Sequence, residues 1–147
     1  MSPSIQLLKD RYLKNIKENP ELYIGIELEF PIVHTKGQPT DIEVSKDLMR
    51  FLIDTLNLEV EKEDQDGNPI QLVEPMSQDR ILFEVSYTTL EFAFGRAQNI
   101  QEVEGRFETY MKVIQEKLGE KNHAIQGWGL HPNWDQNDNR PVAYPRY

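Results

Sequence analysis

Residues 22–33 read LYIGIELEFPIV, a stretch in which apolar side chains recur at every second position. Successive side chains of a strand point to opposite faces, so this alternation predicts a β-strand with one apolar face. The apolar face would be formed by Ile24, Ile26, Leu28 and Phe30. Glu27 and Glu29 would share the opposite face with Gly25. We therefore expect a strand that packs on a core with one side and presents two neighbouring carboxylates on the other.

Two carboxylates without an opposite charge between them repel each other, and their apposition raises a pKa unless a cation lies between them. Mg²⁺ and Mn²⁺ prefer oxygen ligands and fit such a place. Gly25, on the same face, leaves room for a substrate. The alternative interpretation is a solvated strand face, on which alternating glutamates are ordinary.

The rest of the chain predicts a mixed helix and strand order. Helices are expected over 3–17, 40–56 and 99–118, with a capping box of Thr40 and Glu43, a helix start at Asn99 and Glu102, and a stop at Gly119. Strands are expected near 58–63, 69–74, 80–87, 88–94 and 123–131, the first two joined by the turn Asp66-Gly67-Asn68. Hairpins and clustered strands favour an α+β fold with a mostly antiparallel sheet over a doubly wound sheet.

Composition excludes several classes of function. The chain has 147 residues, which suits one domain, a net charge of −9, and no cysteine. Disulfides, thiolate metal sites and cysteine nucleophiles are therefore excluded. The negative charge argues against nucleic-acid partners and anionic membranes. The first residues have neither a signal-peptide pattern nor a membrane span, and we expect a cytoplasmic protein.

Glu84 and Glu91 are two further carboxylates in apolar surroundings. Burial of a carboxylate without a partner is costly, so each is a candidate ligand, although an outward-facing strand position explains either one equally well. Their positions have opposite parity, so in one unbroken strand they would face opposite sides. We expect both to reach one site only if a bulge or turn interrupts the strand between Ser86 and Leu90.

Three residues toward the C-terminus are also candidates. His131 shares its parity with Gly127 and Gly129, a face that is open enough for a pocket wall, although a lone histidine is also commonly structural. Arg146 could bind a carboxylate or phosphate through its planar guanidinium, or could simply be solvated. Tyr147 follows it.

These segments together resemble the start of glutamate–cysteine ligases (γ-glutamylcysteine synthetases) of the bacterial and plant-like branch. The resemblance is carried by Gly25-Ile26-Glu27-Leu28-Glu29-Phe30, Phe83-Glu84-Val85-Ser86, Leu90-Glu91-Phe92, Gly127-Trp128-Gly129-Leu130-His131-Pro132-Asn133-Trp134 and Pro145-Arg146-Tyr147. Two departures stand out. The plant-like pattern has Gly-Ala-Pro where this chain has Tyr87-Thr88-Thr89, and ligases of this family continue far beyond the segment that Pro145-Arg146-Tyr147 resembles.

The resemblance implies that residues 1–147 are the N-terminal part of a ligase catalytic domain, not competent alone. In such enzymes ATP phosphorylates the γ-carboxylate of glutamate, and the amine of cysteine then attacks the acyl phosphate in the first step of glutathione synthesis. It implies Glu27, Glu29, Glu84, Glu91 and His131 as ligands or neighbours of Mg²⁺ or Mn²⁺. Arg146 would be a catalytic residue that also binds an anionic substrate group together with Tyr147. The implied sheet is the curved antiparallel sheet of glutamine synthetase, with helices on its outer face.

Two alternatives stay open. One is a non-catalytic fragment or interaction module that keeps the ligase fold and self-associates through an exposed sheet edge. The other is a metal-dependent nuclease, which is disfavoured because the chain is acidic and has no Glu-x-Lys motif. We expect Glu27 and Glu29 to lie on one concave surface with Glu84.

Overall fold

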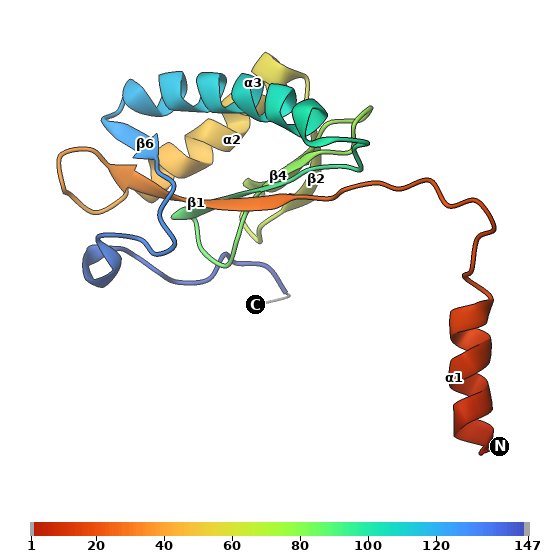
Figure 1. The fold of residues 1–147 in the computed structure, drawn as a ribbon. Helices are drawn as coiled ribbons and strands as arrows, with labels where there is room; N and C mark the ends of the chain where they lie inside the picture. Colours follow the sequence, from red (N-terminus) through yellow and green to blue (C-terminus); the bar gives the residue numbers. More distant parts are fainter. Residues whose placement is uncertain (1, 146–147) are drawn as a thin grey trace.

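The structure, a computed structural model, describes residues 2–145 as an α+β fold with one antiparallel sheet (Figure 1). The helices are α1 (Pro3–Leu13), α2 (Ile42–Leu56) and α3 (Ile100–Gly119), followed by the short 3₁₀ turn η1 (Trp134–Gln136). The strands are β1 (Glu27–His34), β2 (Glu59–Glu63), β3 (Pro69–Val73), β4 (Arg80–Phe83), β5 (Thr89–Ala93) and β6 (His123–Ile125). The predicted α+β class with an antiparallel sheet is therefore confirmed.

The six strands form the order β2-β3-β4-β5-β1-β6, with antiparallel neighbours throughout. Helices α2 and α3 lie together over one face of this sheet, while the segment after β6 runs along the other face (Figure 1). Leu28 of β1 lies opposite Phe92 of β5, and both pack in the core with Leu48 of α2 and Ile114 of α3. The apolar face predicted for residues 22–33 is thus the face that α2 and α3 cover.

Several elements are shorter than predicted. β1 begins at Glu27 rather than residue 22, because Ile24 makes only an isolated bridge with Ala97. β6 ends at Ile125, before the glycine-containing loop that was expected to extend it. α1 ends at Leu13 instead of reaching residue 17, and none of its side chains is buried, so no packing extends it.

The N-cap of α2 is Asp41 and not the predicted Thr40. The Asp41 carboxylate accepts the Glu43 N–H at 3.0 Å. Thr40 is instead buried, and its hydroxyl donates to the Ile32 carbonyl at 2.5 Å. The Thr40 hydroxyl is therefore engaged with the Ile32 carbonyl of β1 and does not cap α2.

The predicted cap of α3 is present. Asn99 accepts the Glu102 N–H at 3.0 Å, and the Glu102 carboxylate accepts the Asn99 side-chain amide at 3.0 Å. We expect Asn99→Ala to lower the free energy of unfolding by about 1 kcal/mol, because the N–H of Glu102 then loses its acceptor. Urea denaturation followed by circular dichroism measures the change. Gln98→Ala, whose exposed side chain makes no capping bond, is the control, and an equal loss in both variants would contradict the prediction.

The two sides of the sheet end differently. The outer strand β2 carries Glu59, Lys62 and Glu63, and such charges oppose edge-to-edge pairing. On the other side, β6 pairs with only Ile32–His34 of β1, so the Glu27–Pro31 half has β5 as its one strand neighbour among the described residues. Self-association at this edge stays a prediction. In the part of the chain described, no helix combines the length and the apolar character needed to cross a bilayer.

Candidate functional site

Three of the predicted carboxylates meet on the sheet face that the helices leave uncovered. Glu29 of β1 lies directly opposite Glu91 of β5, and Glu27 lies opposite Ala93. Residues opposite each other in an antiparallel pair point to the same face. Glu27 and Glu29 are exposed, whereas Glu91 is only 9% exposed. The β1 pair therefore flanks a glutamate that is almost completely enclosed.

Glu84 reaches the same face because β4 and β5 form a hairpin. Leu82 lies opposite Glu91, and two residues later the Glu84 N–H donates to the Thr89 carbonyl at 3.1 Å. The turn between the strands contains Val85 in the left-handed region, with φ 63°. The expected interruption of the strand is thus confirmed, although it starts at Glu84, slightly earlier than predicted. It resolves the opposite parity of Glu84 and Glu91.

The clustering of these carboxylates changes the ionisation of Glu91. Burial raises the pKa of Glu91 to about 7, and a hydrogen bond with the Glu84 carboxyl and repulsion from Glu84, Glu27 and Glu29 add to the increase. The other three predicted glutamates therefore all act electrostatically on Glu91. At neutral pH the Glu91 carboxyl is therefore about half protonated, whereas an isolated glutamate would be ionised.

We call the sheet surface that carries Glu27, Glu29, Glu84 and Glu91 the acidic face. A cavity of about 220 Å³ adjoins it. Its floor includes Glu29, Pro31 and Thr89 of the sheet, and its wall is the segment 128–134. The wall residues are Trp128, Gly129, Leu130, His131 and Trp134. The Glu-x-Glu strand and the Gly-Trp-Gly-Leu-His block, about a hundred residues apart in the chain, therefore line one space.

His131 holds this wall in place. The side chain is 7% exposed, its Nε2 lies 2.8 Å from the Ile32 carbonyl oxygen, and its Nδ1 accepts the Asn133 N–H at 3.1 Å. Nε2 is also 3.1 Å from the Thr40 hydroxyl. Both ring nitrogens are engaged by these contacts, so the geometry supports the structural interpretation of His131 and does not support its role as a metal ligand. Arg146 and Tyr147 lie outside the described residues.

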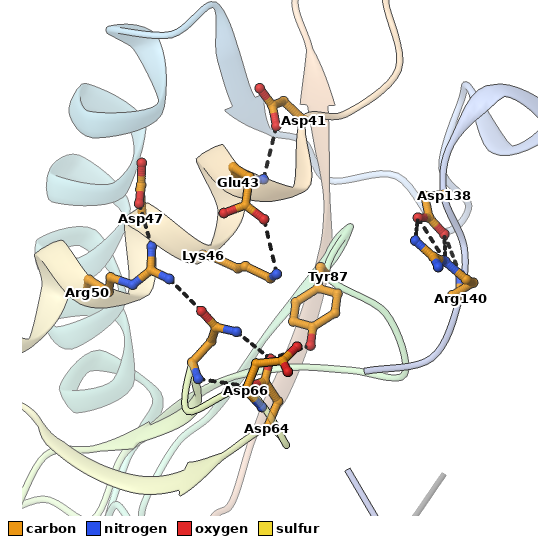
Figure 2. Close-up of polar contacts among 11 residues, drawn as sticks. Asp41, Glu43, Lys46, Asp47, Arg50, Asp64, Asp66, Tyr87, Asp138 and Arg140 are labelled. Carbon is orange, nitrogen blue, oxygen red and sulfur yellow. Dashed lines mark hydrogen bonds and ion pairs between the residues drawn. The ribbon is translucent and has the colours of Figure 1, made fainter. Parts of the chain in front are cut away.

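A second cavity, of about 290 Å³, was not predicted from the sequence. Figure 2 shows Lys46 of α2 beside Tyr87 of the β4–β5 turn, with Asp64 and Asp66 of the β2–β3 turn below the ring. Lys46 Nζ lies 5.1 Å from the ring centroid and 3.1 Å from the Glu43 carboxylate. The Tyr87 hydroxyl donates to Asp64 at 2.7 Å. Burial is the main cause that raises the pKa of Tyr87 to about 12, and this hydrogen bond is the second.

Across this second cavity, Asp138 and Arg140 form an ion pair with each other. Each of the two ion pairs lies within one segment. The contacts of Tyr87 with Lys46 and Asp64 are the ones that join α2 and two turns into a junction here. No local motif could have predicted it, because these groups come from segments far apart in the sequence. The Asp66-Gly67-Asn68 signal predicted only the turn, which is present with Gly67 at φ 77°.

The donor set of the acidic face fits a hard divalent cation, since it consists of carboxylate oxygens. As the side chains stand, residues 2–145 contain no group of three or more His, Cys, Asp or Glu side chains arranged to hold an ion. Binding would therefore require rotation of the exposed Glu27 and Glu29 side chains toward Glu91. Long, exposed glutamates can make such a movement at the cost of side-chain entropy and of mutual repulsion, which a bound cation would offset.

No protein-family model matches the chain, and none of the curated proteins compared with it matches either.

Proposed function

We propose that this chain supplies the metal-binding acidic face of an ATP-dependent glutamate–cysteine ligase. The observation that carries the proposal is the convergence of Glu27, Glu29, Glu84 and Glu91 on one sheet face. These glutamates belong to segments that resemble the ligase family, and another such segment, residues 127–134, walls the adjacent cavity. The proposal includes a cytoplasmic location and a sheet that belongs to the larger, glutamine-synthetase-like sheet of a longer catalytic domain.

The proposed chemistry is phosphorylation of the γ-carboxylate of glutamate by ATP, followed by attack of an amine, cysteine in the family, on the acyl phosphate. Both ATP and glutamate are anions, and an acidic face repels them in the absence of a cation. Bound Mg²⁺ or Mn²⁺ would reverse this repulsion and neutralise the charge on the transferred phosphoryl group. Glu27 and Glu29 would hold the cation from β1, while Glu84 and Glu91 would hold it from the β4–β5 hairpin.

The carboxylates also have a proton-holding role in this proposal. Glu91, with its raised pKa, is about half protonated near neutral pH, and a cation would displace that proton. The enclosed position of Glu91 keeps water from solvating its charge, so the cation becomes its main source of stabilisation. The Trp128 and Trp134 side chains, at the cavity wall, would exclude water from a bound ligand.

We expect Mg²⁺, with ADP and glutamate present, to bind the wild-type chain, and Glu27→Gln/Glu29→Gln to weaken that binding at least tenfold, because two of four carboxylate ligands are lost. Isothermal titration calorimetry measures both. The matched control is Glu59→Gln/Glu63→Gln, which removes the same charge from exposed positions of β2. Equal affinity in the two double variants would contradict the metal site.

The alternative is a non-catalytic interaction module. It is favoured by one observation, namely that α1 carries exposed apolar side chains, none of which is buried against the rest of the described chain. Absence of any Mg²⁺ binding by the wild-type chain would support this alternative over the ligase proposal. The two functions are thus separated by the same titration.

A further inference from the structure

Helix α1 presents an apolar stripe to solvent. Ile5, Leu8 and Tyr12 are 50%, 56% and 76% exposed, and they follow the i, i+3, i+7 spacing of one helix face. The helix has 11 residues and buries no side chain. Isolated helices shorter than about 12–15 residues are marginal in water, so α1 needs a packing partner to be stable.

An apolar groove of about 420 Å³ lies at the N-terminal half of α3. Its lining consists of Ile26, Leu28, Ile100, Val103, Glu104 and Phe107. The α3 residues among these also follow one helix face, at i, i+3, i+4 and i+7. Ile100 is 52% exposed, so the groove is open at the end where the chain enters β1.

The α1 stripe and the α3 face match in pattern and are opposite in charge. In α1 the sequence Ile5, Leu8, Lys9, Tyr12 has the same spacing as Ile100, Val103, Glu104, Phe107 in α3, with a lysine where α3 has a glutamate. Residues 3–17 carry four basic side chains and one acidic one, in a chain of net charge −9. Glu102, Glu104 and Glu108 make the exposed surface beside the groove acidic. Two helix faces of this kind attract each other electrostatically and bury apolar area when packed.

The arm between α1 and the sheet indicates which copy of α1 fills the groove. Ile24 is fixed by a pair of backbone hydrogen bonds to Ala97, at 2.8 and 3.1 Å. From there the exposed arm runs outward, roughly along the line of β1, and holds α1 away from the sheet (Figure 1). For α1 to enter the groove of its own chain, the arm would have to reverse its direction. A second copy needs no such reversal.

We propose that α1 of one copy docks its Ile5–Tyr12 stripe into the Ile26/Phe107 groove of a second copy, so that two copies exchange their N-terminal helices. This dimer is independent of the proposed ligase activity and uses neither sheet edge. An exchange of identical elements is a common route to symmetric dimers, because each contact is made twice. In it, Lys9 of one copy lies against Glu104 of the other.

Cysteine cross-linking tests the contact directly, because the chain has no cysteine of its own. We expect Lys9→Cys and Glu104→Cys, purified separately and then mixed under mild oxidation, to form a disulfide-linked heterodimer on a non-reducing gel. Asp10→Cys, which lies off the stripe, is the control partner for Glu104→Cys and should give at least tenfold less. Equal yields from the two mixtures, or no heterodimer, would overturn the proposal. The proposal would also be overturned if the double variant Lys9→Cys/Glu104→Cys formed its disulfide only within one chain.

Sedimentation velocity gives a second readout. The wild-type chain at about 100 μM should sediment as a dimer, and Leu8→Glu should sediment as a monomer. Leu7→Glu is the matched control, because Leu7 is 71% exposed on the opposite side of α1. Neither variant disturbs the folded body, since α1 buries no side chain in it. A monomeric wild type, or equal dissociation by both variants, would contradict the exchange. Loss of Mg²⁺ binding would leave it unaffected.

Discussion

Asp79→Ala is expected to lower the free energy of unfolding by about 3–5 kcal/mol, because it leaves a charged partner unpaired. Asp79 is 2% exposed and accepts hydrogen bonds from the Gly95 N–H at 2.8 Å, from Arg106 at 2.7 Å and from the Tyr110 hydroxyl at 2.9 Å. These donors come from the segment after β5 and from α3. Without the carboxylate, the Arg106 guanidinium, 23% exposed, would lose its ion pair.

The backbone around Asp79 has little freedom to fill the space that removal of the carboxylate would leave. A Cβ built on Gly95 would lie 1.9 Å from the Ser77 carbonyl oxygen, so the β3–β4 connection and the segment after β5 already pack main chain against main chain. Urea denaturation monitored by tryptophan fluorescence measures the loss. Asp47→Ala is the control, since the Asp47–Arg50 pair is solvent-exposed and should contribute less than about 1 kcal/mol. Equal losses from Asp79→Ala and Asp47→Ala would refute the role assigned to Asp79.

This Asp79 network shows where prediction from sequence ends. Neither Asp79 nor Arg106 belongs to a motif, and the contact between them depends on how α3 crosses the sheet. The same is true of Lys46 and Tyr87, which meet only because α2 and the β4–β5 turn pack together. Contacts of this kind are set by tertiary packing, about which local periodicity carries no information.

Local signals were sufficient where the structure uses local physics. The alternation in residues 22–33 predicted correctly which face of β1 is buried, and Asn99 with Glu102 predicted the start of α3. At Thr40 the same capping logic failed, because the Ile32 carbonyl of β1 competes for the hydroxyl. Local patterns therefore predict an element until a buried partner from elsewhere offers a better hydrogen bond.

The acidic face lies between these two cases. Parity alone placed Glu27 and Glu29 together, and the structure confirms that placement. For Glu84 and Glu91, parity alone would have separated them, and only the expected interruption of the strand could reconcile them. The hairpin supplies it, with Val85 in the left-handed region. His131 does line a cavity, but the parity argument for it was wrong, because β6 ends at Ile125 and residues of both parities line the wall. The His131 ring nitrogens are engaged in holding that wall.

Glu91→Gln is expected to stabilise the protein by about 3–4 kcal/mol at pH 8 and by only about 1 kcal/mol at pH 5. The folded-state pKa of Glu91 is about 7, above the value of about 4.3 for an unfolded glutamate. Between these two values the folded state holds a proton that the unfolded state has lost. The stability that this proton contributes is complete below about pH 4 and is lost as the pH rises through 7. Glutamine keeps the protonated shape of the side chain at every pH, so the variant escapes that loss.

Thermal and urea denaturation between pH 5 and pH 8 measure this difference, with Glu63→Gln as the charge-matched control at the exposed end of β2. A stability difference between Glu91→Gln and wild type that does not change with pH would contradict the prediction. The response to Mg²⁺ then shows whether the acidic face binds a metal ion or merely gathers mutually repelling carboxylates. If Glu91 is a ligand, millimolar Mg²⁺ at pH 8 should restore stability to the wild type and do so far less in Glu91→Gln, because a bound cation favours the ionised carboxylate. An equal response of both proteins to Mg²⁺ would mean that the four glutamates repel one another without serving a metal, and the ligase proposal would lose its main support.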